Sequence, residues 1–156
     1  MIPAFVSARR PSAVRTMGEG ALQEFSITIT PRMYETDAMG HINNASIAAW
    51  FEVLRVRFME ERLENGPSFV FDPSAGVGWI LASVHIDYRG ETFYGSDVTG
   101  RIQEVEIGNS SIKFVGEMEQ DGRTTMSGYA VLVFIDLETR RPVRVPDEVR
   151  SALLGD

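Results

Sequence analysis

One long apolar stretch sets the strongest limit on how this chain can fold. Between residues 44 and 64, large apolar side chains recur at helical spacing: Ile47, Trp50, Phe51, Leu54 and Phe58. Small or apolar residues at 45, 48, 49 and 53 leave little polar surface in the first three turns, and charges gather only near the end. We therefore predict a helix that is buried on most of its sides and stops at Asn65-Gly66-Pro67.

The other elements that the sequence predicts are mostly strands. An alternating run over residues 24–30 ends at Pro31, and a loop rich in Pro and Gly follows the long helix over residues 68–78. Further strand-like runs cover residues 79–88, 98–107, 111–119 and 124–137, and a short helix is expected over about residues 147–154. Asp121-Gly122 predicts a hairpin turn.

Two of these runs also predict which side chains share a face of the sheet. Strict alternation over residues 79–88 would place five side chains on one face: Ile80, Ala82, Val84, Ile86 and Tyr88. The run from Tyr129 to Ile135 is apolar on both faces, which is typical of a central strand.

This order of elements favours a single α+β domain in which one curled antiparallel sheet of five or six strands wraps around one helix. The chain has 156 residues, 44% of them hydrophobic, which is enough for one core. Such a sheet has exposed edge strands, and the helix is incompletely covered at one end. We therefore expect a homodimer.

Composition excludes several classes of function. The sequence contains no cysteine and two histidines in separate segments, which argues against disulfides, thiolate catalysis and zinc sites and implies no metal or cofactor. The formal net charge of −7 disfavours nucleic-acid binding. No run reaches the roughly 18–20 apolar residues of a membrane span, so we expect a soluble protein, and the absence of cysteine fits a reducing cytoplasm.

The first twenty residues show no clear period and are rich in Arg, Ser and Ala. This composition superficially resembles a targeting segment, but it lacks a sustained amphipathic pattern. We interpret residues 1–20 as a disordered extension, or as upstream sequence if translation starts at Met17, and residues 21–156 as the folded domain.

The segment from Tyr34 to Asn44 concentrates the chemically active side chains just before the long helix. It brings Asp37, His41 and two asparagines to a helix N-terminus, where exposed backbone N–H groups attract negative charge. Each residue also has a purely structural interpretation: Asn43 or Asn44 as the N-cap, Gly40 in a turn, and Asp37 as a loop carboxylate. It is the combination that favours an active site.

Residues 34–55 resemble the hotdog-fold acyl thioesterases of the 4-hydroxybenzoyl-CoA thioesterase type. That family pattern is an aspartate, a glycine three residues later, a polar residue at the helix start and an aromatic–Glu pair, here Asp37, Gly40, Asn44 and Phe51-Glu52. The run from Gly40 to Asn44 is more similar to the branch related to acyl-carrier-protein thioesterases. Weaker similarity extends the resemblance to about residues 24–150.

The resemblance implies hydrolysis of an acyl-CoA or acyl-carrier-protein thioester, with paired active sites at a homodimer interface. Hotdog dimers pair in several ways, so the resemblance leaves a dimer and a tetramer open. Asp37 would be the nucleophile or general base, and the backbone N–H of Asn44 would polarise the thioester carbonyl. His41 would act as a second base, as an orienting group or as a proton shuttle; a structural loop histidine is the equal alternative. Glu35 is expected to face solvent, and Glu52 to be a buried hydrogen-bonding or interface residue.

Other polar residues have weaker functional interpretations. Candidates for contacts to substrate phosphates are Arg89, Arg101, Arg140 and Arg141, although isolated arginines are usually solvated. His85 shares a strand face with Ser83 and Asp87 and could line an acyl pocket. Two rival functions stay open, a hydratase or dehydratase acting on acyl thioesters and a non-catalytic acyl-thioester-binding module.

Overall fold

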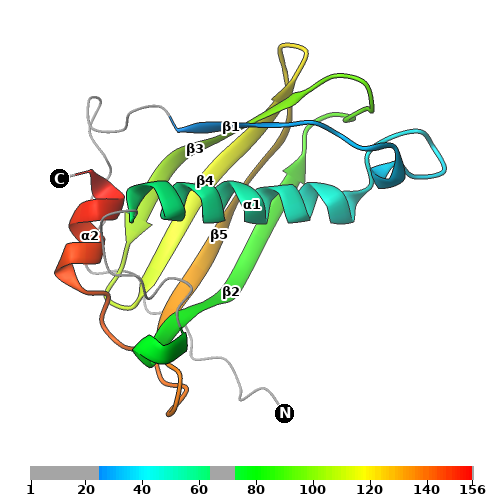
Figure 1. The fold of residues 1–156 in the computed structure, drawn as a ribbon. Helices are drawn as coiled ribbons and strands as arrows, with labels where there is room; N and C mark the ends of the chain where they lie inside the picture. Colours follow the sequence, from blue (N-terminus) through cyan, green and yellow to red (C-terminus); the bar gives the residue numbers. More distant parts are fainter. Residues whose placement is uncertain (1–24, 64–72, 156) are drawn as a thin grey trace.

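The computed structural model describes residues 25–63 and 73–155. Five strands form one antiparallel sheet in the order β1-β3-β4-β5-β2. Their bounds are β1 Ser26–Ile29, β2 Val77–Tyr88, β3 Val98–Ile107, β4 Ser111–Gln120 and β5 Arg123–Asp136. The long helix α1, Asn44–Arg62, lies across one face of this sheet, and the short helix α2, Asp147–Leu154, packs near its C-terminal end (Figure 1).

The predicted architecture, a curled antiparallel sheet around one long helix, is confirmed, with five strands. Each predicted strand and helix is present, and its ends differ from the expected ones by two residues or fewer where the structure describes them. The expected helix stop at residues 65–67, part of the loop over residues 68–78 and the extension over residues 1–20 lie outside the described residues.

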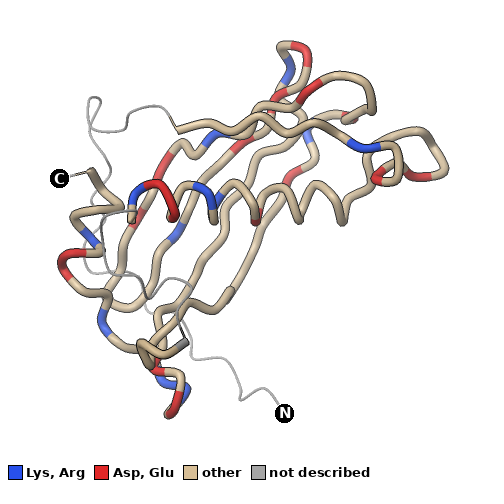
Figure 2. The backbone as a smooth tube through the Cα atoms, viewed as in Figure 1, with Lys and Arg blue, Asp and Glu red and all other residues tan. Residues whose placement is uncertain are grey.

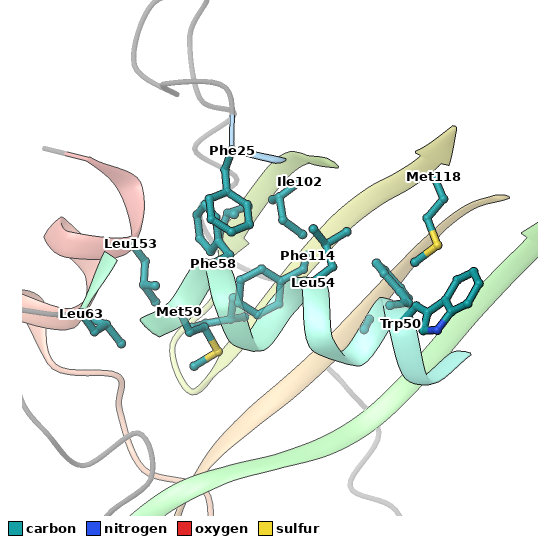
Figure 3. Packing of buried hydrophobic residues seen from close by; sticks show 14 of the residues in the cluster. Phe25, Trp50, Leu54, Phe58, Met59, Leu63, Ile102, Phe114, Met118 and Leu153 are labelled. Atoms are coloured by element: carbon teal, nitrogen blue, oxygen red, sulfur yellow. The ribbon is translucent and has the colours of Figure 1, made fainter. Parts of the chain in front are cut away.

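The core forms where α1 meets the sheet. Phe58 packs edge-on against Phe25 and Phe114, with ring centroids 5.3 and 5.9 Å away (Figure 3). Phe51 approaches the sheet at Gly116, where a Cβ atom would lie only 2.9 Å from the Phe51 ring. A glycine at this position therefore lets the helix lie close to the strands.

The helix is less enclosed than its sequence predicts. Ala48, Ala49, Glu52 and Val53 are exposed, so the expectation of burial on most sides is wrong for the isolated chain. The cause is the position of α1, which lies nearest to β1 and β3, so that Leu81, Val84 and Tyr88 on the same face of β2 stay about half exposed. A strip of apolar surface therefore stays open between α1 and the edge strand β2.

A β-bulge changes the phase of the side chains along β2. Pairing with β5 shifts between Leu81 and Ser83, so Trp79 and Leu81 lie on the same face as Val84, Ile86 and Tyr88. The expectation that Ile80 shares this face is therefore wrong, because one extra residue, the unpaired Ala82, reverses the alternation. Trp79 instead packs on Phe134, with ring centroids 4.6 Å apart.

No helix within the described ranges combines the length and the apolar character needed to cross a bilayer.

Candidate active site

The loop between β1 and α1 is held in place by Glu35. One of its carboxylate oxygens accepts a hydrogen bond from the Trp50 indole N–H at 2.9 Å, and the other accepts from the Arg32 backbone N–H at 2.8 Å. Its backbone carbonyl accepts from both the backbone and the side-chain N–H of Asn43, at 2.8 and 2.7 Å. The expectation that Glu35 faces solvent is therefore wrong; this residue ties the loop to the helix.

The structure shows which of the two asparagines at the helix start is the N-cap. Asn43 is the N-cap of α1, and its side-chain oxygen accepts from the Ser46 backbone N–H at 2.8 Å. Asn44 is the first helical residue and is exposed. No group among the described residues accepts a hydrogen bond from its backbone N–H, which remains available to a ligand.

Asp37 lies in a tight turn in which its two carboxylate oxygens have different hydrogen-bond environments. Gly40 closes the turn with φ +81°, and the backbone N–H of Asp37 donates to the His41 carbonyl at 2.8 Å. Oδ1 accepts the backbone N–H groups of Met39 and His41, at 2.8 and 3.2 Å. Within the described residues Oδ2 has no hydrogen-bond donor, so one oxygen anchors the side chain and the other is free to act.

His41 pairs with a residue that the motif does not contain. Its Nε2 atom lies 3.3 Å from the Glu91 carboxylate, and its ring packs edge-on against Phe93 at 5.1 Å. The backbone of this segment is fixed too, because Ile42 donates to the Thr92 carbonyl at 2.7 Å. Sequence reasoning missed Glu91 because the β2–β3 loop that carries it is fifty positions from His41, and no spacing rule links the two.

All three predicted site residues line one pocket of about 330 Å³. Ile42 and Ile47 are its buried apolar members, and the segment from Tyr88 to Thr92 supplies the opposite wall. The pocket thus combines a free carboxylate oxygen, a paired imidazole and an unoccupied N–H at a helix N-terminus. This arrangement could activate water and stabilise an oxyanion. Within the described residues no three His, Asp or Glu side chains gather as they would at a metal site.

Glu52 and His85 lie away from this pocket. Glu52 is exposed on α1, so the expectation of a buried residue is wrong for the single chain, and only its interface interpretation stays a prediction. Its neighbour Arg55 is buried; burial lowers the pKa of that guanidinium, and the Glu52 charge partly opposes the effect. His85 lies on β2 beside Asp87 at 3.1 Å and stacks on Tyr129, on the sheet face opposite α1.

Known proteins share this fold and this stretch of sequence. The family model "Thioesterase-like superfamily" matches residues 31–153. Long-chain acyl-CoA thioesterase FadM from Escherichia coli (strain K12) is 24% identical over 127 residues, which cover 80% of this chain and 93% of FadM.

Among solved structures, a predicted thioesterase from Bacillus stearothermophilus is 32% identical with a TM-score of 0.69, and the match covers 83% of this chain and 93% of that one. A thioesterase from Thermus thermophilus, solved with coenzyme A and Zn, is 24% identical with a TM-score of 0.67, covering 82% of this chain and 95% of that one. The matched range of the family model includes every pocket residue described above.

Proposed function

The chain belongs to the thioesterase-like superfamily, and from this membership we propose that it is an acyl-CoA thioesterase that uses the pocket at the N-terminus of α1. One observation carries the assignment of the site. Asp37, with one oxygen anchored and the other free, lines the same pocket as Asn44, whose backbone N–H opens the helix. A thioesterase needs a base or nucleophile beside an oxyanion donor, and in this proposal Asp37 and the Asn44 N–H take these two roles.

The proposed reaction begins with the thioester oxygen at the Asn44 N–H. Asp37 Oδ2 takes a proton from a water molecule, whose oxygen then attacks the thioester carbon and forms a tetrahedral oxyanion. The N–H group and the positive end of the helix dipole stabilise that charge. In the alternative route Asp37 Oδ2 attacks the thioester carbon directly and the carbon–sulfur bond breaks. Water then hydrolyses the acyl-enzyme anhydride, which releases the acid and restores the Asp37 carboxylate.

His41 completes the proton balance in this proposal. Collapse of the oxyanion breaks the carbon–sulfur bond and expels a thiolate, and the proton that Asp37 took from water passes through the His41 imidazole to the departing sulfur. Glu91 accepts from Nε2 and so fixes the orientation of the ring. His41 is therefore assigned a catalytic role and Glu91 a positioning role.

The functional unit in this proposal is a homodimer. β2 is an edge strand of twelve residues, and Leu81, Val84 and Tyr88 on its α1-facing side are about half exposed. A second copy would cover this apolar strip and the open side of α1, and Tyr88 carries the strip into the pocket. Two such dimers could also pair to give a tetramer with the same active sites.

The proposal also covers the acyl group of the substrate and the cellular compartment in which the enzyme acts. The name of FadM suggests long-chain acyl-CoA as the first substrates to test, and acyl-carrier protein is the alternative thiol carrier. The absence of cysteine fits a reducing cytoplasm, which cell fractionation would test.

A thiol-release assay over short, long and aromatic acyl-CoAs tests the function. Hydrolysis predicts one free thiol for each acid formed. A change in enoyl-thioester absorbance without thiol release would instead indicate a hydratase or dehydratase. Ligand-dependent thermal stabilisation without turnover would indicate a binding module.

A further inference from the structure

The four arginines that the sequence offers for contacts to substrate phosphates lie in different parts of the molecule. Arg140 and Arg141 lie in the turn after β5, beside the Val77 end of β2, whereas Arg89 follows the Tyr88 end (Figure 1). β2 has twelve residues, so at about 3.3 Å per residue its ends are about 36 Å apart. Arg101, on β3, is paired with Glu119 at 3.2 Å. Arg89 is the only Lys or Arg among the residues that line the described pocket.

The guanidinium of Arg89 is held against Ser127 and Asp87, toward the sheet face opposite α1, and one of its edges is open. Its Nε donates to the Ser127 hydroxyl at 2.9 Å, and its Nη2 lies 3.4 Å from the Asp87 carboxylate. That same Asp87 oxygen is 3.1 Å from His85 Nε2, so the carboxylate is shared between two partners. Within the described residues Nη1 has no acceptor, and the side chain is 58% exposed. Two neighbours therefore fix the planar group while one edge stays open.

The charges around the pocket make this cation important for an anionic substrate. Asp37 and Glu91 are carboxylates of the lining, and the whole chain carries a net charge of −7. Figure 2 shows Lys and Arg positions interspersed with Asp and Glu positions along the described backbone. The field of the protein thus does not attract a phosphate group, and a local cation must do so.

We propose that Arg89 binds a phosphate of the thiol carrier, so that the enzyme selects phosphopantetheine thioesters over thioesters that lack phosphate. The proposal rests on the assignment of this pocket as a thioesterase site. Its chemistry is a charge-assisted, forked contact from Nη1 and Nη2 to phosphate oxygens. This contact lies outside the reacting bonds, so it strengthens substrate and transition state equally and acts on KM rather than on kcat.

Three thioesters of one acyl group test this inference: acylpantetheine, acyl-phosphopantetheine and acyl-CoA. Arg89→Ala is expected to raise KM for the two phosphate-bearing thioesters about 10-fold or more at unchanged kcat, and to leave acylpantetheine unaffected. Arg89→Lys should restore part of the affinity, because it keeps the charge and loses the fork. An effect on acyl-CoA alone would assign the contact to a phosphate of the nucleotide.

Arg144→Ala is the matched control. Arg144 is 57% exposed, pairs with Asp147 at 2.6 Å and does not line the pocket, so its loss should change no kinetic constant. An equal change for acylpantetheine, or no change for any thioester, would overturn the role of Arg89 while leaving the hydrolase assignment intact.

Binding of coenzyme A, measured by calorimetry, decides the inference even if no thioester is hydrolysed. Wild type should bind coenzyme A more tightly than pantetheine, and Arg89→Ala should remove that difference. Equal affinity of the wild type for both compounds would contradict a phosphate contact.

Discussion

At the scale of single residues, the site depends on how each side chain is held. Asp37 is exposed, yet two backbone N–H groups fix one of its oxygens, so the carboxylate is oriented without being buried. His41 is held between Glu91 and Phe93. Orientation of this kind lowers the barrier by reducing the motion that must be frozen during the reaction.

Glu91 gives a prediction at this scale. Glu91→Ala should lower kcat about 10-fold at nearly unchanged KM, because His41 loses the group that orients its ring. Glu91→Gln keeps an acceptor oxygen and should lose less. Steady-state kinetics with an acyl-CoA measures both variants, and Glu138→Ala, in an exposed turn outside the pocket, serves as the control.

A double-mutant cycle separates this role from a general structural effect. If Glu91 acts through His41, then adding Glu91→Ala to His41→Ala should cause little further loss of kcat. Fully additive losses would show that the two residues act independently and would remove the positioning role.

The long-range pairs at this site mark the limit of prediction from sequence. The motif and the helix start are local patterns, so Asp37, Asn44 and His41 could be placed in one pocket in advance. The Glu35–Trp50 and Glu91–His41 contacts depend on how distant segments meet, and local spacing says nothing about them. The bulge in β2 was missed for a related reason, since one inserted residue reverses a pattern that otherwise alternates.

At the scale of elements, Asn43 caps α1, and the next residue, Asn44, is the oxyanion donor of our proposal. Asn43→Ala removes the N-cap and one bond to Glu35, so the free energy of unfolding should fall by about 1–2 kcal/mol. Asn44→Ala should change it by less than about 0.5 kcal/mol, because that side chain is exposed. Urea unfolding measures both, and equal losses would contradict this division of roles.

A proline substitution tests the oxyanion donor directly. Asn44 is the first helical residue, a position that accepts proline, and Asn43 before it already has φ −69° and ψ 153°. Asn44→Pro therefore removes one backbone N–H without breaking the helix, and kcat should fall about 10²–10³-fold. Asn44→Ala keeps the N–H and is the control; a helix that stays intact with wild-type turnover would exclude the N–H from catalysis.

At the scale of the whole molecule, the open side of the fold explains what a second copy would contribute. The sheet ends at β2, whose apolar face and neighbouring helix surface are uncovered in one chain. The sequence predicted an incompletely covered helix at one end. It could not show that the apolar strip between α1 and β2 is open, because that depends on where α1 crosses the sheet.

Association of two chains can be tested by a substitution in this apolar strip. Wild type should have twice the 17.4 kDa mass of one chain, or a higher even multiple, in sedimentation equilibrium. Val84→Lys puts a charge into the apolar strip and should shift the protein toward monomer with reduced activity. Lys113→Ala, on the opposite sheet face, should leave the dimer intact; a monomeric, fully active wild type would contradict the proposal.

The measurement that tests the central claim most directly is thiol release by Asp37→Asn. Asparagine can still accept the N–H groups of Met39 and His41, so the turn and the melting temperature should be unchanged. The account predicts that kcat falls about 10²–10⁴-fold on the best acyl-CoA substrate, because the free oxygen no longer acts as base or nucleophile. Wild-type turnover by a folded Asp37→Asn protein would contradict it.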